Sequence, residues 1–226
     1  MYKILLILMF NINFVFGQTK LNHRLKLELD SIFILDQKYR ELLSLSDSQT
    51  SFDSIAKTYK IPNEKLNSFL ISKLIETDSI NLKRIKEIIS EYGYPGKSMV
   101  GEPTNETSFY VIQHSNEIDK YIQTFRIATK NNELSFSLLT KMIDRNLMQH
   151  NKKQIYGTQG KGIKLFDSNI NDYVFTYIIW PVRNPLFVNK RRKKAGLESS
   201  VEDNAKDLGI KYIVYTMRKY RKLLKK

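Results

Sequence analysis

Residues 21–45, LNHRLKLELDSIFILDQKYRELLSL, decide the fold class of this chain. Apolar side chains recur there at spacings of three, four and seven residues, the pattern of one long amphipathic helix. These residues are Leu21, Leu25, Leu29, Ile32, Tyr39 and Leu43. Asp36 and Arg40 lie four residues apart within the same stretch, so they share one face of the helix. We interpret this pair as a surface ion pair, and an exposed pair of this kind stabilises a protein little.

Helical periodicity continues through the middle of the chain. Weaker helices are predicted over 52–59 and 64–77. A clearer one is predicted over 80–92, capped by Asp78 or Ser79 and ended by Gly93. After a loop rich in Gly and Pro, Thr104 or Asn105 can cap the next helix. Apolar stripes then predict two more helices, over 118–125 and 136–143.

The pattern changes at Gly157. Residues 163–166 and 173–180 are typical of two strands joined through the turn-rich segment 167–172. A last helix, or a pair of helices broken near Gly209, is predicted over 201–224. The predicted fold is therefore mainly α, a multi-helix single domain over 18–226 with a small β-hairpin in the C-terminal third.

The N-terminal residues have the layout of a signal peptide. Lys3 provides a short positive region, an apolar run follows over 4–16, and Gly17 provides a small residue before the cleavage point. We predict cleavage near Gly17 and export to the periplasm or beyond, with an uncleaved N-terminal anchor as the alternative. The chain contains no cysteine, which excludes a lipoprotein anchor and disulfides.

The chain is strongly basic, with a formal net charge of +14. One interpretation is attraction to anionic partners. The other is a solvated surface of scattered lysines, because most of them are not clustered. The exception is the tail 218–226, RKYRKLLKK. It could contact an anionic surface such as a membrane, or it could simply favour the C-terminal end of a helix dipole.

Polar residues suited to a functional site lie between the apolar runs of the second half. His114, Asp144 and Arg145 are candidate catalytic residues, since an imidazole transfers protons near neutral pH and a guanidinium binds anions. Amide, phenol and hydroxyl groups around Gly157 suit a neutral ligand. The candidate ligand-binding residues are Gln154, Tyr156, Thr158, Gln159, Arg191 and Arg192. In each case the alternative is a structural role: a hydrogen-bonded His, a buried ion pair, a structural turn or a solvated basic loop.

Several motifs with known chemistry are missing from the sequence. There is no H-E-x-x-H, no P-loop pattern and no G-x-S-x-G. We therefore predict no metal site and no cofactor.

His114, the pair Asp144-Arg145, the block 154–159 (QIYGTQ) and the segment 191–197 (RRKKAGL) together resemble DUF6624, an uncharacterised bacterial domain family. The segments 36–40 (DQKYR) and 81–95 resemble its amino-terminal part. The resemblance covers about residues 27–215. It implies no catalytic role, because that family has no established activity.

Two classes of function follow from these residues. The first is an exported hydrolase acting on an envelope or extracellular substrate, in which His114 is the base and Arg145 or Arg192 stabilises developing negative charge. The second is a non-catalytic ligand-binding or envelope-associated structural protein. The expected ligand is a small molecule, a glycan or a peptide rather than nucleic acid.

Overall fold

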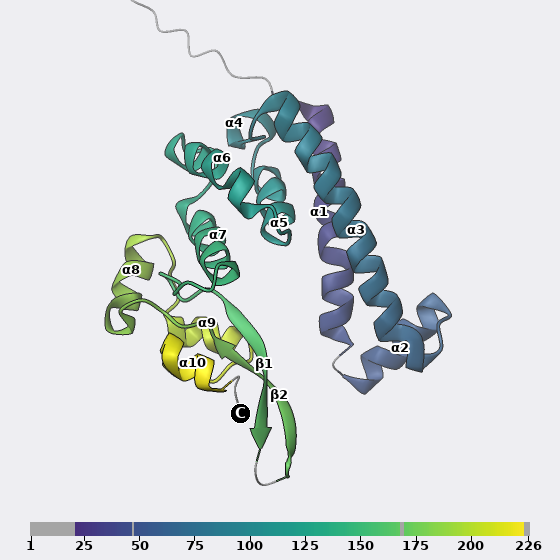
Figure 1. The fold of residues 1–226 in the computed structure, drawn as a ribbon. Coiled ribbons are helices and arrows are strands. Elements are labelled where there is room, and N and C mark those ends of the chain that lie inside the picture. The colour runs from purple at the N-terminus through teal and green to yellow at the C-terminus, as the bar shows by residue number, and fades with distance from the viewer. Residues whose placement is uncertain (1–20, 47, 168–169, 224–226) are drawn as a thin grey trace, which may run out of the picture.

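The computed structural model describes residues 21–46, 48–167 and 170–223 of the chain. The signal peptide predicted over 1–17 and the last three residues of the basic tail lie outside this part. Export therefore stays a prediction, as does the membrane contact of the tail. No helix within the described part is long and apolar enough to cross a membrane. Described residues are mainly helical with one hairpin (Figure 1), which confirms the predicted fold class.

Two long helices pack side by side and form an elongated part of the molecule (Figure 1). They are α1 (His23–Leu45) and α3 (Asn63–Tyr92), and the short α2 (Gln49–Tyr59) joins them. The predicted start of a new helix at Asp78 or Ser79 is wrong, because α3 runs straight through this point. The Asp78 carboxylate does not cap a helix there; it accepts a hydrogen bond from Arg40 instead. Gly93 ends α3 at φ 74°, as predicted.

A group of shorter helices packs against this pair and builds the main core. It consists of α4 (Lys97–Val100), the 3-10 helix η1 (Thr104–Glu106), α5 (Thr107–Gln113), α6 (Ile118–Lys130) and α7 (Phe136–Gln149). Large apolar side chains from different helices are fully buried together, among them Ile85, Phe109, Phe125 and Met142. The core fixes α5 between α1 and α7, and this arrangement positions the candidate site.

The C-terminal third begins with an antiparallel hairpin, β1 (Gly160–Asp167) and β2 (Asp172–Ile179), whose tip extends away from the helices (Figure 1). One face is buried through Ile163 and Ile178 against Trp180 and Tyr220. The opposite face leaves Phe175 and Tyr177 exposed. A two-stranded ribbon alone is only marginally stable in water, so this hairpin depends on the packing of its inner face.

Three short helices follow the hairpin: α8 (Val188–Lys194), α9 (Val201–Asp207) and α10 (Met217–Leu223), with a 3-10 turn η2 (Pro185–Phe187) before α8. The basic run 190–194, interpreted above as a possible loop, lies in α8. The chain breaks at Gly209 as predicted, but 211–216 is not helical. Tyr220 of α10 is buried, with its ring centroid 4.6 Å from that of Trp180. The described part of the tail therefore packs on the rest of the chain through Tyr220 and Leu223.

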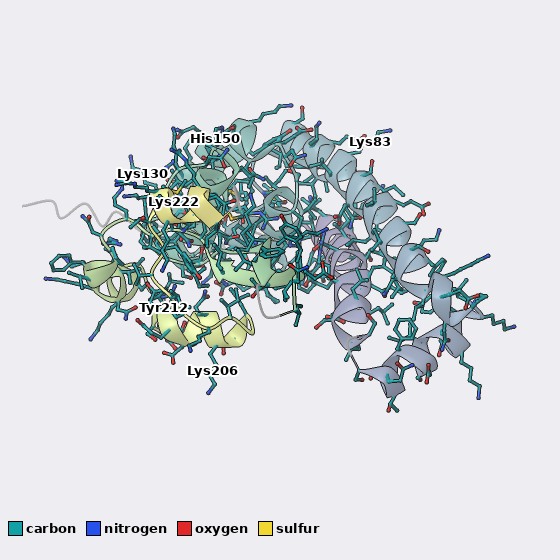
Figure 2. All side chains as sticks on the ribbon, turned by 60° about the horizontal axis from the view of Figure 1, so that its bottom comes forward. Lys83, Lys130, His150, Lys206, Tyr212 and Lys222 are labelled. Carbon is teal, nitrogen blue, oxygen red and sulfur yellow. The ribbon has the colours of Figure 1, made fainter. Side chains whose placement is uncertain are left out.

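The basic residues are spread over the surface. Figure 2 shows Lys83, Lys130 and Lys206 on separate parts of the molecule, with Lys222 close to Lys130 in this view. They belong to α3, α6, α9 and α10. This distribution agrees with the interpretation of the net charge as a solvated basic surface.

Candidate active site at the junction of α1, α5 and α7

A carboxylate–imidazole pair forms where α5 ends against α1. His114 is the C-cap residue of α5, and its Nδ1 lies 3.3 Å from Oδ2 and 3.4 Å from Oδ1 of Asp36. The Asp36 side chain is buried, whereas that of His114 is 21% exposed. Nδ1 faces the carboxylate, and no described residue bonds Nε2. An imidazole held in this way presents an acceptor nitrogen, Nε2, toward solvent.

The neighbours of Asp36 hold it in the charged form. Gln37 Nε2 donates to Oδ2 at 2.7 Å, and Arg40 Nη2 lies 3.6 Å from Oδ1. Burial by itself raises the pKa of Asp36, but His114 and then Arg40 outweigh it and hold the pKa below its ordinary value. The carboxylate is therefore charged at neutral pH and can orient and stabilise an imidazolium.

Two polar contacts join the helices α1 and α3 close to Asp36 in the sequence of α1. Arg40 donates to Asp78 of α3. One turn further along α3, the buried Asn81 donates from Nδ2 to the backbone O of Ile32, at 3.3 Å. These contacts join α1 to α3 on the same side as Asp36, so the orientation of Asp36 depends on the packing of the helix pair.

The interpretation of Asp36 and Arg40 as a surface ion pair is wrong. Asp36 is 1% exposed, because the C-terminal end of α5 covers it. A signal for this burial was present in the sequence. Asp36 follows Leu25, Leu29 and Ile32 at the same three- and four-residue spacing, so it continues the buried stripe of α1.

Removal of the Asp36 charge should make the stability of the protein less sensitive to acid. A carboxyl whose folded-state pKa is lowered contributes stability above its unfolded pKa and loses it as pH falls through the folded pKa. Wild type should therefore exceed Asp36→Asn in stability at neutral pH, and the difference should shrink below about pH 4, where unfolded Asp titrates. Urea unfolding of both forms across this range measures the difference. A difference that is independent of pH would contradict the prediction.

Arg145 of α7 points in a different direction from its neighbour Asp144, as expected for adjacent residues about 100° apart on a helix. Its guanidinium forms no hydrogen bond or ion pair with any residue that the structure describes, and its Nε is buried. Burial lowers the pKa of Arg145, and the like charge of Arg40 lowers it further. Among the described residues Arg145 therefore has no partner of opposite charge.

Asp144 binds the loop that follows α7 through hydrogen bonds. Its carboxylate is fully buried and accepts hydrogen bonds from the backbone N–H groups of Ile155 (2.6 Å), Tyr156 (3.1 Å) and Thr158 (3.0 Å), and from Thr158 Oγ1 (3.0 Å). Burial raises the pKa of Asp144, and these donors oppose that effect. Since both carboxylate oxygens accept hydrogen bonds, the geometry supports a structural role for Asp144.

The two glutamines of the block 154–159 bind the backbone around them. Gln154 Nε2 donates to the O atoms of Gln159 (3.1 Å) and Trp180 (2.6 Å), and its Oε1 accepts from Gln159 N at 2.9 Å. Gln159 Nε2 donates to Lys141 O and to Thr158 Oγ1. Gln154, Thr158 and Gln159 are all buried. Their polar groups form hydrogen bonds with groups in and around the turn, which supports the structural alternative for these three candidates.

Arg191 and Arg192 of α8 also bind backbone groups. Arg191 donates to the O atoms of Ile155, Arg183 and Asn184. Arg192, 1% exposed, donates to Tyr156 O at 2.9 Å and to the backbone O and Oγ of Ser199. These donors are used within the protein, so the geometry ties α8 to the loop and does not favour ligand binding by either arginine.

Gly157 and Tyr156 complete this loop. Gly157 has φ 70°, and a Cβ there would come within 2.5 Å of Val201 Cγ2 on α9, so both the turn and the close approach require glycine. The Tyr156 ring packs edge-on against Phe136. Burial raises the pKa of its phenol, and Asp144 adds to that effect.

The hydrogen bonds place eight of the nine candidate residues in two groups, whereas Arg145 forms none with the described residues. The group at the helix junction contains His114 with Asp36, Gln37, Arg40 and Asp78; we call it the junction cluster, and we assign Arg145 to it because the charge of Arg40 acts on it. The other, the loop network, contains Asp144, Gln154, Tyr156, Thr158, Gln159, Arg191 and Arg192. Among described residues no hydrogen bond joins the two groups, although Asp144 and Arg145 are adjacent in sequence. No group of three or more potential metal ligands occurs in the described part of the chain.

A surface hollow of about 620 Å³ lies elsewhere, between α3 and α6, with Lys86 and Tyr121 in its lining. No candidate residue lines it. Lys86 is already paired there with Glu117 at 2.7 Å.

Comparison with known proteins gives the family of this chain. No curated protein and no solved structure matches it significantly. A family model does match, over residues 37–212, which include His114, Arg145 and the whole loop network. Because this match covers most of the chain, the protein belongs to DUF6624, a family of unknown function.

Proposed function

We propose that this protein is a hydrolase in which His114 is the general base. The observation that carries the proposal is the contact of Nδ1 with the buried carboxylate of Asp36, which leaves Nε2 directed away from it. Nε2 can take a proton from a water molecule as the water oxygen attacks the substrate, and Asp36 then stabilises the imidazolium. The proton can return to the leaving group as the bond to it breaks.

Arg145 is the candidate for stabilising negative charge that develops during the reaction. It has no described partner of opposite charge, and Arg40, which lies 3.6 Å from Asp36, acts on it electrostatically. Donors that are fixed before the reaction stabilise developing charge most effectively. Arg192, the other candidate named above for this task, has its donors occupied by Tyr156 and Ser199. The export predicted from residues 1–17 would place the substrate in the envelope or outside the cell.

The test is a panel of chromogenic substrates: 4-nitrophenyl phosphate, bis(4-nitrophenyl) phosphate, 4-nitrophenyl acetate and 4-nitrophenyl glycosides. We expect turnover of one class. His114→Ala should lower kcat/KM by roughly 10²–10⁴, the usual contribution of a positioned acid–base group. Asp36→Asn should also lower kcat/KM, without abolishing substrate binding.

The matched control is His150→Ala. His150 also pairs with an aspartate, since its Nε2 lies 3.0 Å from Asp119 Oδ2, but that pair is exposed. Activity should therefore survive the change. Equal loss in both histidine variants, or unchanged activity in His114→Ala, would contradict the proposed role of His114.

A non-catalytic binding protein is the second candidate, and the unpaired Arg145 also favours it. A cation without a partner can bind an anionic ligand whether or not His114 reacts with it. This candidate gains support if no substrate of the panel is turned over while anions still raise the Tm.

A further inference from the structure

A small hollow lies between α1 and the segment that forms η1 and the start of α5. Its volume is about 70 Å³, several times the roughly 10–15 Å³ that one water molecule needs. Phe33 and Tyr110 line it, and one turn further along the same helices lie Asp36 and His114. Residues three or four apart share a face of a helix. The hollow and the Asp36–His114 pair therefore lie next to each other along the contact between α1 and α5.

Two carboxylates line this hollow, and one of them has no cationic partner. Asp30 is paired with Lys26, whose Nζ lies 2.7 Å from Oδ2, and its Oδ1 accepts from Thr104 Oγ1 at 2.6 Å. Glu106 forms no ion pair with any described residue, and the hydrogen bond that it accepts from the Tyr110 hydroxyl is long, at 3.4 Å. Burial raises the pKa of Tyr110, and the negative charge of Glu106 raises it further. One carboxylate thus stays unpaired here, in a chain whose net charge is +14.

A buried hydroxyl also lines the hollow without a partner. Thr107 is 1% exposed, and its Oγ1 forms no hydrogen bond with any residue that the structure describes. The large majority of buried polar side-chain atoms have such a partner. Thr104, buried in the same lining, follows this rule, since it donates to Asp30 and accepts from Lys26 Nζ at 2.9 Å. A free hydroxyl beside an unpaired carboxylate indicates a ligand that brings its own N–H donors.

Two aromatic rings complete the lining. The ring centroids of Phe33 and Tyr110 lie 5.4 Å apart, with their planes inclined by 58°. Phe33 stays 37% exposed. Aromatic rings attract cations, and the attraction increases when the cation leaves water. Rings beside an unpaired carboxylate therefore suit an organic cation, whereas an anion would be repelled.

We propose that this hollow binds the ammonium group of a small organic cation. Its N–H groups donate to the Glu106 carboxylate and to Thr107 Oγ1, and its carbon atoms lie against the rings of Phe33 and Tyr110. One consequence rests on the proposed hydrolase function: the substrate carries an ammonium group, and the bond to be cleaved lies one helical turn away, beside His114.

The experiment measures binding of methylammonium chloride to the purified protein by ¹H–¹⁵N NMR, against sodium chloride at the same ionic strength. Tetramethylammonium, which has the charge but no N–H group, and sodium acetate are titrated in parallel. We expect methylammonium to shift the amide signals of the lining residues in a saturable way, tetramethylammonium to bind more weakly and acetate not to bind. Glu106→Gln should raise the dissociation constant for methylammonium about tenfold, since a hydrogen bond to a charged group contributes roughly that factor.

Glu76→Gln is the matched control. It removes the same charge from an exposed carboxylate of α3, which is paired with Lys73 at 2.8 Å, and it should bind methylammonium as the wild type does. Thr107→Val removes only the hydroxyl, so it should weaken the binding of methylammonium and leave that of tetramethylammonium unchanged. The inference is overturned if methylammonium causes no saturable shift, if Glu106→Gln and Glu76→Gln bind it equally, or if acetate binds more tightly.

Failure of this inference can be distinguished from failure of the proposed function. His114 does not line the hollow, so His114→Ala should retain methylammonium binding and lose turnover. Binding that depends on Glu106, with no hydrolysis of any chromogenic substrate, keeps the cation site and removes the hydrolase. Turnover that depends on His114, with no methylammonium binding, keeps the hydrolase and removes the cation site.

Discussion

Asp144→Asn should destabilise the protein by about 3–5 kcal/mol, the usual cost of removing one partner from a buried charged network. The carboxylate accepts from three backbone N–H groups and one hydroxyl within residues 155–158. An amide of the same shape would direct its NH₂ group at one of these donors. The loop carries the backbone oxygens that bind Arg191 and Arg192, so its displacement also loosens α8. Urea unfolding monitored by circular dichroism measures the loss.

Asp119→Asn provides the comparison for this effect. Asp119 is 65% exposed on α6, and its bonds to Asn146 and His150 lie at the surface. Its substitution should change stability by no more than about 0.5 kcal/mol. A loss below about 1 kcal/mol for Asp144→Asn would show that the loop does not depend on this carboxylate, and the structural role of Asp144 would be wrong.

Trp180→Ala should have an effect of similar size, about 3–5 kcal/mol, since it removes the largest fully buried side chain of the described part. The indole packs against the Tyr220 ring of α10, and its Nε1 donates to Lys152 O at 2.7 Å. It therefore connects the hairpin, α10 and the segment after α7. Loss of this contact should release α10, which increased proteolysis of the C-terminal residues would reveal.

Two variants of graded size test this packing. Trp180→Phe keeps one ring but loses the donor to Lys152 and part of the buried indole, so it should cost about 1–3 kcal/mol, less than Trp180→Ala. Tyr177→Ala removes a 56% exposed ring from the same hairpin and should cost less than either Trp180 variant. Equal losses for Trp180→Ala and Tyr177→Ala would contradict the assignment of the hairpin's inner face as its stabilising side.

The candidate site was only partly predictable from the sequence. His114 and Arg145 stand out by residue type, and both lie in the junction cluster. Asp36 was assigned to the surface because an acidic residue four positions from an arginine usually belongs there. Its partner His114 is 78 residues away in the chain, so no local pattern specifies that contact.

The residues of the loop network were found from the sequence, but their role was not. Its residues were correctly singled out as a set, and their hydrogen bonds connect them closely. Residue type alone does not distinguish a polar side chain that binds a ligand from one that satisfies buried backbone groups, because both use the same donors and acceptors. Gln154 donates to the backbone of the turn and of the residue after β2, and Gln159 donates to the backbone of α7.

The sequence by itself determined the elements that depend on local rules. The stripe of α1, the end of α3 at Gly93 and the hairpin all follow from periodicity and from glycine at a positive φ. Only the tertiary structure decided that α3 continues through Asp78. The Asp78 side chain accepts a hydrogen bond from Arg40 of α1 and does not cap a new helix. Tertiary structure likewise distinguished Asp144, whose oxygens all accept hydrogen bonds from the loop, from Arg145, which has no partner among the described residues. Local propensity acts within a few residues, whereas the burial and pairing of a charge depend on whatever the fold brings against it.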